Sequence, residues 1–302
     1  MSEQKWLRSS LRSLSERLEQ AGHQASAPTV SRLLQKHAYA LRVNAKKKEG
    51  GAQHPERDAQ FRYLESQKQA FRAAGEPIIS VDTKNKELIG NFKNAGQAWK
   101  QEAEAVNGHD FLSEALGRGV PYGIYDVQHN NGVIYVGHSA DTAEFAVEAI
   151  KRWWHEHGQQ TYPKATKLLI LADAGGSNGC RPRLWKEQLQ SQLSDALGLT
   201  ITVCHYPTGC SKWNPIEHRL FSFISINWAG QPLRTFETML QLIRGTTTRT
   251  GLKVSAHLLE GVFETGKKVT DAVMKTLNIT RHTTCPRWNY TIHPRLAQVP
   301  AS

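Results

Sequence analysis

The sequence predicts an α/β fold in which a mixed β-sheet is flanked by helices. Short β-branched or apolar runs typical of strands alternate with longer amphipathic stretches typical of helices. An Asn-Gly pair between two such runs indicates a hairpin, and one run is apolar throughout, as expected of a central buried strand. Of the 302 residues, 39% are hydrophobic and 22% are charged, so the chain can bury a sizeable core.

A single strand and then a strand pair are predicted after residue 54. A helix over about 56–74 leads to the β-branched strand Pro77–Asp82, which ends in an acid. The runs Tyr122–Val127 and Val133–Val136 are two more strands, and the Asn131-Gly132 pair between them is a strong hairpin signal. We therefore expect one strand followed by an antiparallel pair.

In the middle of the chain, the sequence pattern predicts alternating helices and strands. Asp141 is expected to cap a helix over Thr142–His157, and Lys167–Asp173 is the fully apolar run. A helix with leucines from Leu184 to Leu197 and a strand over Leu199–His205 follow. This order is typical of a mixed, helix-flanked sheet of the RNase H type, although other α/β folds could carry it.

The pattern weakens after Asn227. Four elements are predicted there: a helix at about 233–244, a Thr-rich turn at 246–248, a helix at 269–277 and a closing strand at Trp288–Ile292.

The first 50 residues predict a small helical region, separate from a main domain over 51–302. Apolar residues recur at helical spacing over 5–20, and a second helix opens near Ser26 after a small-residue turn. Two short helices so joined resemble a helix-turn-helix, with Arg32 and Lys36 available to a DNA groove. The alternative is a plain helical hairpin that packs on the main domain.

The charge of the chain favours a polyanionic partner. Its formal net charge is +11, and DNA, RNA or an anionic membrane would suit such a surplus, whereas a basic enzyme indifferent to DNA is the alternative. Lys46, Lys47 and Lys48 lie in a basic, glycine-ended stretch after the second helix. We interpret this stretch as an arm that contacts DNA phosphates, or otherwise as a solvated loop.

Membrane and disulfide-rich classes are disfavoured. No apolar run approaches the roughly 20 residues of a membrane span, and the N-terminus lacks the apolar core of a signal peptide, so we expect a protein of the bacterial cytosol or nucleoid with no membrane partner. The four cysteines form no CxxC pair. The Cys and His residues between 204 and 218 match no structural zinc spacing.

Three acids occupy positions from which they could share metal ions. Asp82 and Asp173 end apolar strands, and Glu217 lies at the start of a helix. Carboxylates fixed in this way can hold two Mg²⁺ ions about 4 Å apart, one activating the attacking hydroxyl and one stabilising the leaving oxygen. Singly, each acid also fits a turn or an ordinary helix start such as Asn214-Pro215. Their joint placement on a basic α/β chain predicts the site.

Residues beside these acids are candidates for DNA contact. The glycine-rich turn after Asp173 lacks the ending of a P-loop and the spacing of a dinucleotide site. Arg181 and Arg183 follow it at a helix N-terminus, a place that favours phosphate. Lys212 is a candidate for a phosphate contact, and Trp213 is a candidate for stacking on a base. The alternative is that Lys212 is a snorkelling surface lysine and Trp213 a core residue.

Several long motifs resemble those of the ISAzo-type insertion-sequence transposases. The segments are His54–Phe61, Val81–Phe92, Leu171–Gly179, Ser211–Ser222 and Trp288–Ile292. The resemblance covers nearly the whole chain. It implies an RNase H-like catalytic domain with a DDE triad, which falls on Asp82, Asp173 and Glu217.

The resemblance also implies an activity. A DNA transposase of this kind would use two Mg²⁺ or Mn²⁺ ions to hydrolyse the phosphodiester at the ends of a mobile element. It would then join the freed 3′-hydroxyl to target DNA, as a homo-oligomer assembled on DNA. Two alternatives stay open: an RNase H-like nuclease without strand transfer, and a transposase-derived, non-catalytic DNA-binding protein, which the intact triad disfavours.

Overall fold

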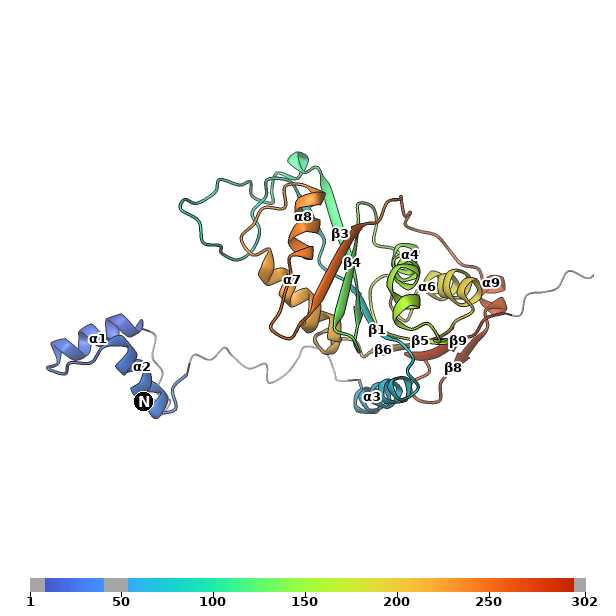
Figure 1. The fold of residues 1–302 in the computed structure, drawn as a ribbon, viewed down its shortest axis with the longest axis horizontal. Helices are drawn as coiled ribbons and strands as arrows, with labels where there is room; N and C mark the ends of the chain where they lie inside the picture. Colours follow the sequence, from blue (N-terminus) through green and yellow to red (C-terminus); the bar gives the residue numbers. More distant parts are fainter. Residues whose placement is uncertain (1–8, 41–53, 296–302) are drawn as a thin grey trace, which may run out of the picture. The chain divides into compact units, whose positions relative to one another are not determined.

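The computed structural model describes residues 9–40 and 54–295, which belong to two compact units, Met1–Gly50 and Gly51–Ser302 (Figure 1). The basic stretch with Lys46, Lys47 and Lys48 lies outside the described residues, as does the first part of the helix predicted over 5–20. Within the described ranges, no helix is both long and apolar enough to cross a membrane.

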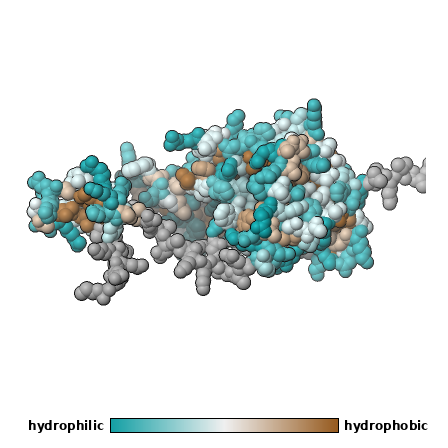
Figure 2. All heavy atoms as spheres, turned by 90° about the horizontal axis from the view of Figure 1, so that it is seen from below, coloured by the Kyte–Doolittle hydropathy of each residue, from teal (hydrophilic) through white to brown (hydrophobic). Residues whose placement is uncertain are grey.

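The small unit consists of two helices, α1 (Leu11–Gln20) and α2 (Ala27–Lys36). The Ser10 side chain caps α1 by accepting from the backbone of Ser13 at 3.1 Å. Of the described residues before 41, only Val30 is fully buried. The apolar sides of both helices surround a hollow of about 340 Å³, and Figure 2 shows hydrophobic atoms gathered on this unit. Two helices are too few to enclose a core of their own.

A mixed nine-stranded sheet forms the centre of residues 54–295. Its strands are β1 (Ile78–Thr83), β2 (Glu87–Ile89), β3 (Gly117–Asp126), β4 (Asn131–Gly137), β5 (Lys167–Asp173), β6 (Thr200–Tyr206), β7 (Lys253–Leu258), β8 (Ile279–Arg281) and β9 (Asn289–Ile292). Their order is β7-β4-β3-β1-β5-β6-β9-β8, with β2 paired to β3. β3 runs antiparallel to β1 and β4, whereas β1, β5 and β6 are parallel. The five strands β4-β3-β1-β5-β6 form the sheet of an RNase H-like fold, and the predicted fold class is confirmed.

Helices cover both faces of this sheet (Figure 1). They are α3 (Arg57–Ala73), α4 (Ala143–Trp153), α5 (Gln159–Thr161), α6 (Arg183–Gln188), α7 (Ser222–Asn227), α8 (Phe236–Arg244) and α9 (Asp271–Thr276). Short 3₁₀ helices lie at Leu112–Glu114 and Ser211–Trp213, and π-helical turns lie at Trp154–Gly158, Leu189–Asp195 and Glu217–Phe221. Because alternate side chains of a strand point to opposite faces, Ile79 and Val81 of β1 pack beneath α4 and α6, while Ile78 packs with α3.

The predicted β3–β4 hairpin is confirmed, but its turn was misplaced. Asn131 and Gly132 lie within β4, and the connection is Val127–Asn130, where Asn130 has a φ of 55°. The carboxylate of Asp126 accepts from the backbone nitrogens of Gln128 at 2.9 Å and His129 at 3.1 Å. These two hydrogen bonds hold the turn and begin the return strand one residue before the expected glycine.

The predicted cap of α4 was wrong. Thr142 is the capping residue, because its side chain accepts from the backbone of Phe145 at 3.3 Å. Asp141 instead accepts from the hydroxyl of Thr83 at 3.1 Å. This contact draws the carboxylate of Asp141 away from the helix and towards the end of β1.

Three strands were not predicted: β2, β7 and β8. β2 and β8 have three residues each, too few to produce a readable alternation. β7 pairs in parallel with β4 at one edge of the sheet, and only one of its six residues is fully buried. An edge strand with partly exposed residues on both faces gives no clear period-2 pattern.

Candidate active site

The three predicted acids come from neighbouring elements. β1 and β5 are adjacent and parallel, with Val81 opposite Ala172, so Asp82 and Asp173 follow side by side at the carboxyl ends of the two strands. Val81 and Ala172 pack beneath α4 and α6, and the two acids therefore point to the opposite face. Glu217 begins the helical turn that packs on that face.

Burial raises the pKa values of all three carboxyl groups, and the charges of neighbouring acids add to this for Asp82 and Asp173. Burial, and then the charge of Asp173, raise the pKa of Asp82 to about 8. Burial, and then the charge of Glu217, raise the pKa of Asp173 to about 6. Burial raises the pKa of Glu217, against the lowering influence of Lys84. The protein thus holds three acids in an environment that disfavours their joint ionisation.

This set of side chains fits a divalent cation. Carboxylate oxygens are the ligands that Mg²⁺ and Mn²⁺ prefer, and a cation would relieve the repulsion that raises the pKa values. Among the described residues, the acids are close enough to influence one another electrostatically. They are not, however, among the groups whose ligand atoms all lie within 4.8 Å of one another.

Asn214 ties the three acid-bearing segments together. Its side-chain nitrogen donates to the carbonyl oxygen of Val81 at 3.3 Å and to Asp173 Oδ1 at 3.2 Å. Its oxygen accepts from the hydroxyl of Ser80, and this hydroxyl in turn accepts from the backbone nitrogen of Ile216 at 3.0 Å. Asn214 is fully buried and is not an ordinary helix cap. It fixes the Glu217 turn against both strands.

His205, in the neighbouring strand β6, contacts the backbone at the end of β5. Its ring is fully buried, and Nδ1 lies 2.8 Å from the carbonyl oxygen of Asp173. Burial lowers the pKa of His205 to about 4, so the ring is neutral at physiological pH and Nδ1–H donates to this carbonyl. His205 thus positions the backbone of a candidate catalytic acid.

A fourth acid near the site was not predicted from the sequence. Asp141, which accepts from Thr83, also raises the pKa of Asp82. The hydroxyl of Tyr122, fully buried nearby, has no hydrogen-bond partner in the described part of the chain. Burial and the charges of Asp82 and Asp141 raise its pKa. The signal was present in the sequence, but the position of Asp141 before a helix suggested a cap.

Trp213 is not a core residue. Its side chain is 51% exposed, lies edge-on to Phe61 at 6.0 Å and is approached by Lys212 at 5.8 Å. Together with Arg57 and Arg62 of α3, Phe61 and Trp213 line a hollow of about 380 Å³. Asp58 lines the same hollow, and Trp213 directly precedes Asn214, whose side chain donates to Asp173 Oδ1.

The other predicted DNA contacts are spread over the surface. Arg32 and Lys36 are exposed on α2, and Arg181 is exposed ahead of α6. Arg183 pairs with Asp271 at 2.6 Å and donates to the carbonyl oxygen of Val269 at 3.2 Å. This arginine links α6 to α9, and its contact with DNA stays a prediction.

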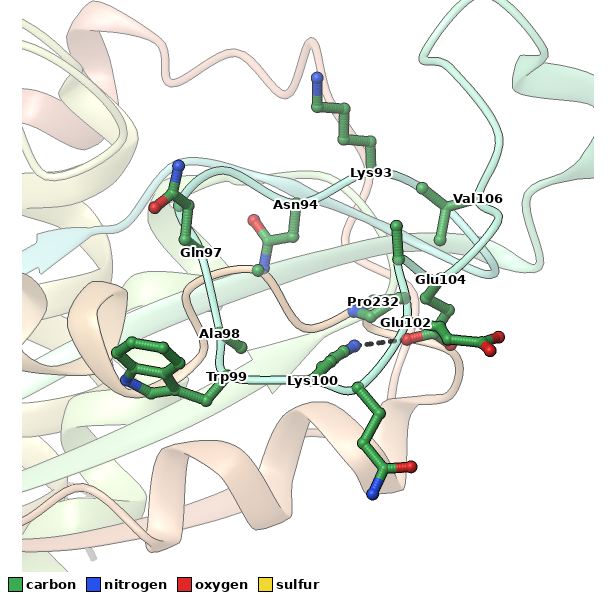
Figure 3. A pocket seen from close by; sticks show the side chains of 14 residues that line it. Lys93, Asn94, Gln97, Ala98, Trp99, Lys100, Glu102, Glu104, Val106 and Pro232 are labelled. Atoms are coloured by element: carbon green, nitrogen blue, oxygen red, sulfur yellow. Dashed lines mark hydrogen bonds and ion pairs between the residues drawn. The ribbon is translucent and has the colours of Figure 1, made fainter.

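One large hollow contains none of the acids. It has a volume of about 750 Å³ and lies between the loop around residues 93–106 and the segment with Gly230 and Pro232 (Figure 3). Lys100 pairs with Glu104 across this loop at 2.5 Å, and the side chain of Trp99 is wholly exposed. Size alone therefore does not identify the candidate active site.

The profile of a protein family, described as the Rhodopirellula transposase DDE domain, matches residues 1–294. The chain belongs to this family of transposase domains. The match spans both units and includes all three predicted acids. No curated protein sequence matches this chain.

Solved structures similar to this DDE domain include three complexes of Mos1 transposase. They are the paired-end complex with the left transposon end (TM-score 0.45, 14% identity), the mariner paired-end complex with Mn (0.44, 13%) and a pre-cleavage transpososome (0.45, 12%). Each alignment covers 78% of this chain and 65% of the solved chain. The chain thus spans slightly less than two thirds of the length of these proteins.

Proposed function

We propose that this chain is the catalytic part of a DNA transposase, in which Asp82, Asp173 and Glu217 hold divalent cations. The observation that carries the proposal is the placement of three half-buried carboxylates on one face of the sheet, where Asp173 and Glu217 raise the pKa of Asp82 and Glu217 raises that of Asp173. Membership of a transposase DDE family supports the same assignment. The substrates would be the ends of a mobile element and the target DNA.

Two Mg²⁺ or Mn²⁺ ions, when bound, would activate the attacking water or 3′-hydroxyl and stabilise the leaving oxygen. The chain's own residues position the ligands for this chemistry. Asn214 orients Asp173 and the Glu217 turn, and His205 fixes the backbone that carries Asp173. Lys84 favours the ionised form of Glu217. A buried network of this kind keeps the acids in place before any ion arrives.

DNA would be bound by several basic surfaces. The hollow at Trp213 offers an aromatic face for a base and guanidinium groups for phosphate, since Arg57 and Arg62 line it as well. Lys212 and Arg181 would contact the backbone nearby. The small unit would bind DNA through Arg32 and Lys36 as a helix-turn-helix, and a homo-oligomer would assemble on the element ends.

A strand-transfer assay tests this function. Purified chain would be incubated with Mg²⁺, target DNA and duplexes that carry pre-cut inverted repeats taken from either side of its gene. Joining of the 3′-ends to the target, abolished by Asp173→Asn, is the expected result. Cleavage without joining would indicate an RNase H-like nuclease, and DNA binding without either reaction would indicate a non-catalytic derivative.

A further inference from the structure

Three side chains that the proposed catalysis does not use lie together at one edge of the sheet. Glu156 and His157 belong to the π-helical turn Trp154–Gly158 that follows α4, and His257 belongs to β7. One ligand atom from each lies within 4.8 Å of the other two. Among the residues that the structure describes, this is the one group of three or more His, Cys, Asp or Glu that meets that distance.

Both histidines present a nitrogen with no partner. The Nε2 atoms of His157 and His257 are buried, and neither makes a hydrogen bond to another described residue. The nearest carboxylate oxygen to His157 Nε2 is Glu156 Oε2 at 4.0 Å, beyond hydrogen-bonding range. Buried polar atoms are nearly always satisfied in folded proteins, so two unpartnered ring nitrogens in a group with one carboxylate are suited to hold a ligand.

The fold holds these side chains in place from behind. Tyr135 of β4 lies opposite His257 in the sheet, and the two rings stack at 5.6 Å. The hydroxyl of Tyr135 donates to Glu156 Oε2 at 2.6 Å. One tyrosine therefore orients two of the three groups, as residues behind the ligands of metal sites do. The π-helical turn is one of three in the described residues, and such turns occur frequently at functional sites.

We propose that Glu156, His157 and His257 form a binding site for a zinc-like transition-metal ion that links β7 to the end of α4. Two imidazoles and a carboxylate suit Zn²⁺, with a water in the fourth position, whereas Mg²⁺ prefers oxygen ligands alone. Ligand atoms bound to one zinc at about 2.0–2.2 Å lie roughly 3.3–3.5 Å apart. Small side-chain rotations would bring the three atoms to that spacing.

This site is distinct from the catalytic acids. His257 lies opposite Tyr135, Tyr135 opposite Tyr122, and Tyr122 opposite Thr83, the neighbour of Asp82. Three strand spacings of about 4.8 Å separate His257 from Thr83, roughly 14 Å. A metal ion here would stabilise the position of the edge strand β7, which has few buried side chains. It would take no part in the reaction on DNA.

Zinc titration of the full chain tests the proposal. The protein would carry Asp173→Asn, so that the catalytic acids contribute less to metal binding, and calorimetry would be paired with visible absorption of bound Co²⁺. We expect one site per chain. His157→Gln and His257→Gln should each weaken it by at least about 100-fold, and Tyr135→Phe by about 10-fold, the scale of a lost outer partner. His155→Gln, an exposed neighbour on the same turn, is the matched control and should bind as the parent does.

Two results would overturn the proposal. One is the absence of Zn²⁺ binding to the Asp173→Asn protein at millimolar Zn²⁺. The other is equal Zn²⁺ affinity of this protein, of both histidine variants made in it and of the His155→Gln control. If His257→Gln fails to fold, as judged by circular dichroism, Glu156→Gln decides, because the side chain of Glu156 is exposed and its loss leaves the packing on Tyr135 intact. Neither readout involves DNA, so failure here is independent of the transposase assay.

Discussion

Asp126 and Asp82 lie at opposite ends of the central strands, and their carboxyl groups have different surroundings. Asp126, at the end of β3, is only 3% exposed, and its carboxylate accepts from two backbone nitrogens and from the hydroxyl of Tyr162 at 2.9 Å. Asp82, on β1, is half-buried and accepts from the backbone of Thr83 at 2.8 Å, while it faces Asp173, Glu217 and Asp141.

This difference separates a structural acid from a functional one. Burial alone does not mark a site, because Asp126 is the more deeply buried of the two. A carboxylate surrounded by donors stabilises the fold through its charge. A carboxylate surrounded by other carboxylates destabilises the fold unless a cation binds it.

The largest effect is expected on catalysis. Asp82→Asn and Asp173→Asn each remove one proposed ligand charge at nearly constant shape. Either should lower DNA cleavage and joining at least about 1,000-fold, equivalent to about 4 kcal/mol of activation free energy. Gel assays of pre-cut and uncut ends would measure this loss. Asp110→Asn, in the loop between β2 and β3, is the control, since Asp110 is exposed. Activity within tenfold of the parent in either site variant would contradict the assignment.

The next effect is on stability and has opposite signs at the two aspartates. Asp126→Asn leaves the turn at Val127–Asn130 with fewer acceptors, and it should lower the free energy of unfolding by about 2–3 kcal/mol. Asp82→Asn replaces a carboxyl group whose ionisation is disfavoured, and it should leave the metal-free protein as stable as the parent or more stable. Urea denaturation with a chelator present would measure both. The comparison fails if Asp82→Asn is the more destabilising change.

DNA affinity should depend on the exposed aromatic beside the acids. Trp213→Ala removes the proposed stacking surface and should weaken DNA binding by about 1–3 kcal/mol, with little effect on stability because the side chain is 51% exposed. Trp213→Phe keeps an aromatic face and serves as the control. Equal affinity of the parent and Trp213→Ala would mean that the ring only covers Phe61.

The smallest effect concerns pH. The raised pKa values of Asp82 and Asp173 mean that the folded state holds these protons more tightly than the unfolded chain does. The resulting stabilisation is complete below the ordinary value of 3.8 and is lost as pH rises through about 6 for Asp173 and about 8 for Asp82. Between pH 6 and 8 the free energy of unfolding of the metal-free protein should fall, as measured by urea denaturation at each pH. Asp82→Asn should flatten this decline, and an identical decline in the variant would contradict the shift.

Strong local patterns in the sequence predicted the centre of this fold. The apolar runs at β1, β5 and β6 were recognisable as buried strands. Because acids directly follow buried residues of β1 and β5, the sequence also indicated that these acids lie at the same edge of the sheet. The network around Asn214 could not be predicted, because Asn214-Pro215 also reads as an ordinary helix start. Only the packed structure turns the side chain of Asn214 towards Ser80 and Asp173.

The His-Glu group illustrates a different limit of sequence patterns. Its ligands come from the end of a helix and from an edge strand about one hundred residues away, so no metal-binding spacing exists to be found. β7 itself was missed because its residues are partly exposed on both faces. Pairing of β7 with β4, a long-range contact, is what brings His257 to Glu156 and His157.

Thermal melting with and without Mg²⁺ would show whether Asp82 and Asp173 hold a divalent cation. At about 10 mM Mg²⁺, well above the dissociation constant of a millimolar-range site, binding to the folded state should raise the melting temperature of the parent. Asp82→Asn and Asp173→Asn should melt at or above the metal-free parent, and Mg²⁺ should raise their melting temperatures less. If both variants melt several degrees below the parent and keep its full Mg²⁺ response, Asp82 and Asp173 are structural acids like Asp126, and the metal site is not where we place it.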